Sequence, residues 1–350
     1  MKDVRIIQKA LEQLIPTSSK VFIVGHDYPD YDALSSAIGL QALSSFLGKE
    51  AYIVINDTEM PVGVRKIKNG VAKRYNIINR EIALSLIDEA SLLILTDVNK
   101  SNMISLGEDN NRFDTTVIID HHNASASTVK TPYKYIDLDA SSASEIVAET
   151  ILLTEPSILT QQLASFLLTG IALDTNKFQN KVTDTTNKVI QDLIAHGASP
   201  TVIQKLLSIG FEHNEKIKNL VINNTVIRQL GADESERHVA FTLNRTSPTE
   251  QYLREELAIA ADELLSTKAE AAFSIGYTTP DVITVSGRSK CDIDVSEILS
   301  TIVGLDGGGN RTSAGARTSS ATVFDVEEKI SERVQNYLKC KQKSKTLDGR

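Results

Sequence analysis

The 350-residue sequence has no tryptophan and only two cysteines, Cys291 and Cys340. Two cysteines cannot form a disulfide framework, and neither lies in a metal-binding spacing, so we expect ordinary thiols in a reducing compartment. Aromatic residues make up only 5% of the chain. That scarcity argues against a stacking platform for long single-stranded nucleic acid.

Long apolar runs and an excess of basic residues are also missing. No apolar stretch reaches the roughly 20 residues that a transmembrane helix needs, and the N-terminal MKDVRIIQKALEQLI has no signal-peptide core. We therefore expect a cytoplasmic protein without a membrane partner. The net charge of −8 argues against a long nucleic acid as partner, although a small nucleotide stays compatible.

The first half of the chain alternates helical and strand patterns. Its apolar runs are rich in Val, Ile and Leu with little alternation, which is typical of parallel strands buried on both faces. We predict an α/β fold, with helices on both faces of a parallel sheet. Such a sheet binds ligands beyond the carboxyl ends of its strands. The predicted strands are Val21–Val24, Tyr52–Ile55, Leu92–Leu95 and Val117–Ile119.

The length allows a second domain with its own core. The sequence predicts helix over Thr185–Gly197, continuing helical sequence from Glu212 to Leu230, and a further helix over Thr249–Thr267. A smaller α/β domain follows the helical linker. The predicted divisions are a catalytic domain over 1–185, a linker over 186–230, a second domain over 231–340 and a frayed tail over 341–350.

Four apolar runs are each followed by Asp or His residues. Carboxylates and imidazoles suit Mn²⁺, Mg²⁺ or Fe²⁺, and an aspartate shared by two ions holds them about 3.5–4 Å apart. An Asp-rich turn around Pro29 is the ordinary alternative for the first motif alone. Four such motifs together indicate a site for two divalent cations beyond the strand ends. The candidate ligands are His26, Asp30, Asp32, Asp97, His121 and Asp174.

These motifs resemble the DHH phosphoesterase family with its C-terminal DHH-associated domain, from about Val21 to Val323. The resemblance implies that His26 and Asp30 bind one metal and that Asp97 is shared. It assigns the other metal to Asp97, Asp32, His121 and Asp174. It further implies a manganese-preferring phosphodiesterase or phosphatase in which a metal-bridging hydroxide attacks phosphorus.

Other polar residues lie beside the proposed ligands in the sequence. His122 is a candidate to position the nucleophile or leaving group. An equally open alternative is that His122 orients a metal-binding residue without binding the metal itself. Asp120 is a candidate to orient a histidine. Ser141, Ser142 and Glu145 lie where the family has a helix start near the metals, with helix capping as the alternative.

The second domain contains SGRSK and the glycine-rich GLDGGGNRTSAGA, which we expect to be a loop. Backbone amides of successive glycines can hold an anion. The resemblance implies that this loop and a nearby arginine bind the second nucleotide of the substrate. Asn310 stands where the family usually has His, which affects substrate identity more than chemistry. The candidate contacts are Arg288, Gly307, Gly308, Gly309, Asn310 and Arg311.

The segments PDYDALSSAIGL, TDVNKS and IDLDASSASEIV look most like the catalytic module of cyclic-di-AMP phosphodiesterases. We therefore predict hydrolysis of cyclic di-AMP or a related linear dinucleotide. A short-RNA exonuclease that also acts on adenosine 3′,5′-bisphosphate is the main alternative. A nucleotide-binding protein without turnover and a pyrophosphatase are further ones. The sequence leaves the oligomeric state open, a homodimer included.

Overall fold

The computed structural model describes residues 2–56, 60–206, 211–231, 237–244, 248–290 and 293–347. The chain divides into two compact units, Met1–Ser208 (unit 1) and Ile209–Arg350 (unit 2). Cys291 lies outside the described residues, and Cys340 is exposed on helix α12 Val323–Leu347. No helix among the described residues is long and apolar enough to cross a membrane.

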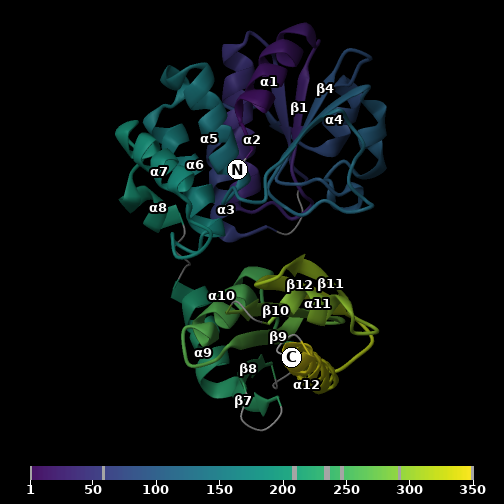
Figure 1. The fold of residues 1–350 in the computed structure, drawn as a ribbon. Helices are drawn as coiled ribbons and strands as arrows, with labels where there is room; N and C mark the ends of the chain where they lie inside the picture. The colour runs from purple at the N-terminus through teal and green to yellow at the C-terminus, as the bar shows by residue number, and fades with distance from the viewer. Residues whose placement is uncertain are drawn as a thin grey trace. The chain divides into compact units, whose positions relative to one another are not determined.

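Unit 1 is built on a six-stranded parallel sheet in the order β3-β2-β1-β4-β5-β6. Figure 1 labels its two central strands, β1 and β4. The strand order reverses between β1 and β4, and doubly wound sheets bind ligands beyond the carboxyl ends of the strands at such a point. The α/β fold predicted from the sequence is confirmed. The strands are β1 Val21–Val24, β2 Ala51–Val54, β3 Ile77–Ile78, β4 Leu92–Thr96, β5 Thr115–Asp120 and β6 Tyr133–Ile136.

Alternate strand residues enter two separate cores, because successive side chains of a strand point to opposite faces. Val21 and Ile23 pack into the larger core, whereas Phe22 and Val24 pack into the smaller one beside Ala83. The larger core lies under α1 Arg5–Thr17, α2 Tyr31–Phe46, α3 Val62–Val71, α5 Ala143–Thr154, α6 Gln161–Asp174, α7 Asp184–Ala195 and α8 Pro200–Leu206. The smaller core lies under α4 Arg80–Leu86 and two short 3₁₀ turns.

Unit 2 contains a second six-stranded sheet, in the order β11-β12-β10-β9-β8-β7. Its neighbouring strands are antiparallel except for β8 and β9. The strands are β7 Thr225–Leu230, β8 Arg237–Leu243, β9 Ala271–Thr279, β10 Val282–Ser289, β11 Asp306–Asn310 and β12 Ser313–Thr318. The helices are α9 Phe211–Asn224, α10 Arg254–Leu265, α11 Val295–Ser300 and α12 Val323–Leu347.

Four sequence-based expectations for unit 2 were wrong. Helix α9 ends at Asn224, and the β-branched residues that follow form β7, paired with β8, where continuing helix was predicted. The glycine-rich segment forms strands β11 and β12 instead of a loop. Helix α10 begins at Arg254, five residues after the predicted start. Helix α12 also continues to Leu347, through most of the predicted frayed tail.

Candidate metal centre

The carboxyl ends of the strands around the switch point carry Asp and His side chains. His26 follows β1, Asp97 follows β4, and His121 follows β5. Asp30 begins helix α2 as its N-cap, and its Oδ1 accepts the backbone N–H groups of Asp32 (2.9 Å) and Ala33 (3.0 Å). The connection from β1 to α2 and the first turn of α2 therefore carry three of the predicted ligands, His26, Asp30 and Asp32.

Asp97 lies between two imidazoles. Its Oδ2 is 3.4 Å from His26 Nε2, and its Oδ1 is 3.3 Å from His121 Nε2. The residue is buried and has a φ of 57°, in the left-handed region that few non-glycine residues adopt. Aspartate tolerates this region better than most residues, and such outliers concentrate at functional sites.

The described structure brings all six predicted ligands together. His26, Asp30 and Asp97 each offer one donor atom, and these atoms lie within 4.8 Å of one another. A second group with the same property consists of Asp32, His121 and Asp174, and a third of Asp97, Asp120, His121 and His122. Asp97 belongs to two groups and is also in contact with His121 of the second, as a shared ligand would be.

Asp174 reaches the cluster from a helix, and the expectation that every ligand follows a strand was wrong. It is the last residue of α6, and its Oδ2 is 3.0 Å from His121 Nε2. Gly170 allows this approach, because a Cβ there would meet the Ser144 side chain and lie 3.0 Å from Asp32 Oδ1. The apolar run before Asp174 is therefore a buried helix.

The N-terminus of helix α5 holds the Asp32 carboxylate in place. Asp32 is fully buried, and its two oxygens accept the backbone N–H groups of Ala143 and Ser144, both at 2.8 Å. The positive end of a helix dipole favours a carboxylate there. Ser142 caps the same helix by accepting the Glu145 N–H at 3.0 Å. Ser142 thus contributes the capping that the sequence left as an alternative.

Glu145 is not a member of any of the three groups of clustered donor atoms. Its Oε2 accepts the Ser141 N–H at 2.9 Å, the Ser141 hydroxyl, and the Thr186 hydroxyl at 3.0 Å. Thr186 belongs to the first turn of α7. The contacts of Glu145 therefore tie α5 to α7.

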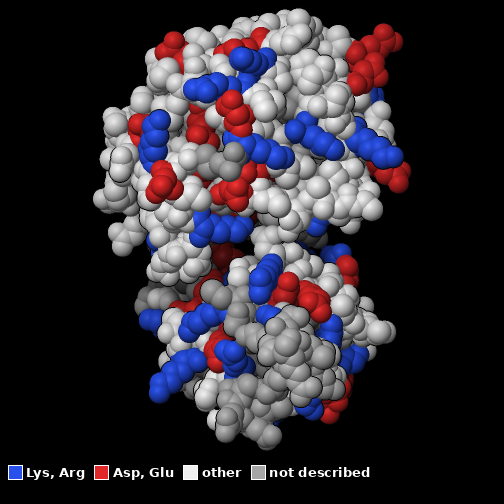
Figure 2. Space-filling model, in the orientation of Figure 1, with Lys and Arg blue, Asp and Glu red and all other residues white. Residues whose placement is uncertain are grey.

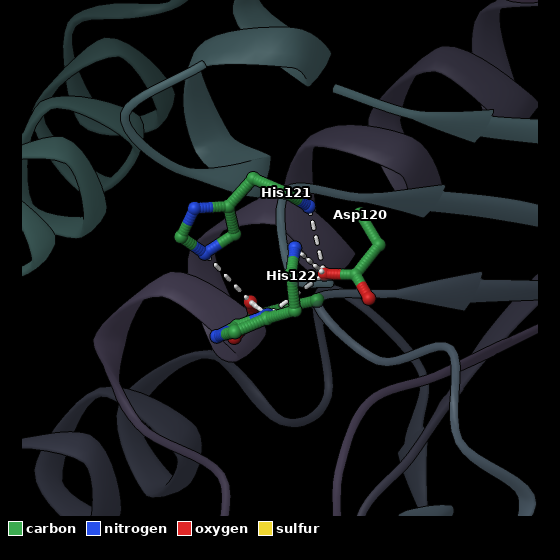
Figure 3. Close-up of side chains that lie close together, drawn as sticks. Asp120, His121 and His122 are labelled. Carbon is green, nitrogen blue, oxygen red and sulfur yellow. Dashed lines mark hydrogen bonds and ion pairs between the residues drawn. The ribbon is translucent and has the colours of Figure 1, made fainter. Parts of the chain in front are cut away.

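Asp120 orients His122 (Figure 3). Its Oδ1 lies 2.8 Å from His122 Nδ1 and accepts the backbone N–H groups of His121 (2.8 Å) and His122 (3.2 Å). The other oxygen accepts the Asn99 amide at 2.5 Å. Sequence reasoning gave Asn99 no role, although it lies only two residues beyond Asp97. It is buried and also donates to the His122 carbonyl at 3.2 Å.

Negative charge accumulates in this cluster and shifts its proton affinities. Burial, with the charge of Asp97, raises the pKa of Asp30 to about 6. Burial raises the pKa of Asp32 as well, and the charges of Asp97 and Asp174 add to the effect. Burial alone would lower the pKa of His26, but its hydrogen bond to Asp97 and the nearby Asp30 raise it to about 9. The cluster therefore favours binding of positive charge.

The donor set fits divalent cations. Asp97 Oδ1 and His121 Nε2 are buried atoms without a well-aligned hydrogen bond to any described group. Buried polar atoms are otherwise almost always paired, so such an atom calls for a ligand. The charged groups that shift the pKa values of His26, Asp30 and Asp32 are all Asp or His. Oxygen and imidazole donors of this kind suit Mn²⁺, Mg²⁺ or Fe²⁺.

The segment after Asp174 has an unusual backbone. Asn176, Lys177 and Phe178 have φ values of 47°, 56° and 66°, and Lys181 has 53°. For non-glycine residues this conformation costs about 1–2 kcal/mol each. Thr175 is fully buried and holds the turn, since its Oγ1 accepts the Phe178 N–H at 3.0 Å.

The predicted substrate contacts lie in unit 2. Arg288 and Asn310 both pair with Ser313, one from β10 and the other from β11, so the three share one face of the sheet. Two strand spacings put Arg288 and Asn310 roughly 10 Å apart. Arg288 Nε donates to Asp262 Oδ1 at 2.9 Å. Arg311 is exposed in the turn after β11.

Comparison with known families separates the same two regions. Residues 20–171 match the N-terminal domain of the DHH family, and residues 241–339 match the DHHA1 domain. The chain therefore contains a DHH domain followed by a DHHA1 domain. This confirms the resemblance seen in the sequence, and the DHH match covers the segments of all the clustered residues except Asp174.

Relatives of this DHH chain include two named enzymes. Cyclic-di-AMP phosphodiesterase GdpP of Geobacillus thermodenitrificans is 31% identical over 341 residues, which cover 95% of this chain and 50% of that protein. Cyclic-di-AMP phosphodiesterase PdeA of Listeria monocytogenes is 28% identical, with 96% and 50% covered. The chain spans about half the length of these relatives. An exopolyphosphatase-related protein from Bacteroides fragilis shares its fold, with a TM-score of 0.78, 18% identity and coverage of 95% and 98%.

Proposed function

We propose that this DHH chain is a metal-dependent phosphodiesterase that hydrolyses cyclic di-AMP or a related linear dinucleotide. The observation that carries the proposal is the convergence of His26, Asp30 and Asp97 with a second group of Asp32, His121 and Asp174. The names of the relatives, which cover nearly all of this chain, support the choice of substrate. We further propose Mn²⁺ as the preferred ion.

Two divalent cations, when bound, would lower the pKa of a shared water and neutralise phosphate oxygens. His26, Asp30 and Asp97 would hold one ion. Asp97 would also serve the second, together with the residues Asp32, His121 and Asp174. The left-handed backbone of Asp97 and the capped α5 N-terminus behind Asp32 hold both carboxylates in place before an ion arrives.

His122 is the group we assign to the leaving oxygen. In hydrolysis, a water oxygen bonds to phosphorus, one P–O ester bond breaks, and the leaving oxygen takes up a proton. Asp120 accepts from His122 Nδ1, so Nε2 is the ring atom left for that proton. Asn99 fixes Asp120 from its other side.

Unit 2 would bind the second nucleotide. Arg288 and Asn310 lie on one face of its sheet, where a guanidinium and an amide can both donate to phosphate oxygens. Basic and acidic side chains are interspersed on the face of unit 1 drawn in Figure 2. A compact ligand held by a few directed contacts suits that surface better than a long polyanion.

The test is turnover by the purified chain after chelation and after addition of single metals. Cyclic di-AMP, the linear dinucleotide pApA, oligoribonucleotides of two to five residues and pyrophosphate are compared with Mn²⁺, Mg²⁺ and Ca²⁺. The proposal expects hydrolysis of one or both adenine dinucleotides, lost on chelation and restored best by Mn²⁺. Preference for oligoribonucleotides would favour the exonuclease alternative. Tight binding without hydrolysis under any metal would favour a nucleotide-binding protein.

A further inference from the structure

The segment Thr175–Lys181 begins where the metal cluster ends. Asp174 contacts His121 and is immediately followed by the left-handed run Asn176–Phe178. Four residues of extended chain span about 14 Å at most, so Phe178 lies within that distance of Asp174. Backbone bonds keep it closer, because Lys177 N donates to Ala172 O at 2.6 Å and Gln179 N donates to Thr175 O at 2.8 Å.

Phe178 gains little from packing in this position. Its side chain is 41% exposed, and a bulky residue with a φ of 66° is a genuine conformational outlier. Glycine would adopt the same backbone freely. An exposed aromatic ring on a strained but well-bonded turn is therefore explained better by something it binds than by the fold.

The chemistry around Phe178 matches a nucleotide. Lys177 and Lys181 are exposed on either side of it in the sequence and add positive charge to an otherwise acidic site. A base stacks on an aromatic ring, and a lysine attracts the adjoining phosphate. A purely apolar ligand would have no use for the lysines.

We propose that Phe178 is a stacking platform for one base of the nucleotide whose phosphate lies at the metal cluster. This inference rests on the proposed function and deepens it, since it names the residue of unit 1 that recognises the base. Lys177 and Lys181 supply positive charge that attracts the phosphate of that nucleotide.

The experiment compares two probes on the full chain. One is a non-hydrolysable phosphorothioate analogue of pApA, and the other is the same backbone without its bases. We expect Phe178→Ala to weaken binding of the adenine analogue by about 5- to 150-fold, the range that stacking of one base supports. Affinity for the abasic analogue should change less than twofold. Phe178→Trp should keep the preference for the adenine analogue.

The matched control is Phe46→Ala. Phe46 is 53% exposed at the last residue of α2, whose 16 residues put it about 22 Å from the end of that helix nearest the cluster. Its replacement should leave both affinities unchanged. Phe178→Gly separates loss of binding from loss of stability. Glycine adopts the left-handed backbone without strain, so this variant should have a higher melting temperature while still binding the adenine analogue more weakly.

Equal affinities of wild type and Phe178→Ala for the adenine analogue would overturn the inference, as would an equal loss for both probes. Failure of wild type to prefer adenine over the abasic analogue would overturn it too. The proposed function is judged separately by hydrolysis. If the wild-type chain binds the adenine analogue through Phe178 but hydrolyses no dinucleotide, the proposed function is refuted and the inference stands. If the wild-type chain hydrolyses a dinucleotide but Phe178→Ala binds the adenine analogue equally well, the inference is refuted and the proposed function stands.

Discussion

At the scale of single residues, Asp97 is the member of the cluster that belongs to two of its groups. It is buried, has a left-handed backbone, and presents one carboxylate oxygen to each of two histidines. Burial on its own would raise the pKa of Asp97, but the neighbouring imidazoles of His121 and His26 lower it below its usual range. The carboxylate is thus kept ionised, as a shared metal ligand requires.

Asp97→Asn should lower kcat at least about 100-fold while leaving the chain folded, because asparagine keeps the size and tolerates the same backbone. That loss corresponds to about 2.7 kcal/mol of transition-state stabilisation. The measurement is turnover of bis(4-nitrophenyl) phosphate at saturating Mn²⁺. Asp114→Asn, an exposed residue just before the other end of β5, is the control. More than a tenth of wild-type activity in Asp97→Asn would contradict a shared ligand.

The pKa shifts of His26 and Asp30 predict how metal binding depends on pH. The folded-state pKa of His26, about 9, lies above its ordinary 6.5, so the stability it contributes is complete below pH 6.5 and lost as pH rises through 9. The folded-state pKa of Asp30, about 6 against 3.8, likewise makes the metal-free protein less stable as pH rises through 6. Cations bind the deprotonated ligands.

The increase in melting temperature caused by Mn²⁺ should therefore be larger at pH 8.5 than at pH 6.0. Differential scanning fluorimetry across that range measures it. His26→Gln should reduce the pH dependence. His196→Gln should preserve it, because the His196 ring lies 2.8 Å from the Asp192 carbonyl at the end of α7, outside the cluster. A metal-induced increase that is independent of pH would exclude His26 as a ligand.

At the scale of elements, the segments after β4 and β5 are joined through Asn99. Its side chain donates to Asp120 and to the His122 carbonyl, and its Oδ1 accepts the Thr128 hydroxyl at 3.0 Å. Asn99→Ala should lower the free energy of unfolding by about 1–3 kcal/mol, since it leaves a buried carboxylate oxygen unpaired. It should also lower kcat through His122. Chemical denaturation and turnover test this, with exposed Asn111→Ala as control; an unchanged kcat would separate Asn99 from the chemistry.

The glycines of β11 offer an internal comparison. Gly309 has a φ of 146°, and a Cβ there would lie 2.6 Å from the backbone of Ala314, whereas a Cβ on Gly308 would meet nothing within 4 Å. Gly309→Ala should therefore destabilise the protein by more than 1 kcal/mol, and Gly308→Ala by less than about 0.5 kcal/mol. Urea unfolding measures both. A higher KM for dinucleotide in stable Gly308→Ala would indicate a substrate contact, and equal destabilisation would contradict the register of β11.

The sequence predicted elements best where one signal dominated. The buried parallel strands β4 and β5 each contain an uninterrupted apolar run, and the residues after them could be placed at one edge of the sheet. Strand β7 was missed because Thr225–Leu230 follows a helix without a glycine or proline break, and its strand form depends on pairing with β8. Asp174 was placed after a strand because an apolar run of that length does not distinguish a buried helix from a buried strand.

At the scale of the whole molecule, we propose different tasks for the two units. Unit 1 contains the clustered Asp and His residues, and unit 2 presents Arg288 and Asn310 on a sheet of its own. Asp262 already pairs with Arg288, so a phosphate must compete with that carboxylate or share the guanidinium with it. A guanidinium has five donors, of which Nε is given to Asp262 and Nη1 to the Ser286 hydroxyl and the Gly287 carbonyl, so sharing would rest on Nη2.

Arg288→Ala should raise KM for pApA about tenfold or more, the effect of losing one charge-assisted hydrogen bond, with a smaller change in kcat. KM for bis(4-nitrophenyl) phosphate should stay within twofold, because that diester has no second nucleotide. Arg228→Ala is the matched control, since it also removes an arginine–carboxylate pair, with Glu327, but from β7 at the opposite edge of the sheet. An equal increase in KM for both substrates would place Arg288 at the reacting phosphate. An unchanged KM for both would show that Arg288 does not help unit 2 to recognise the dinucleotide.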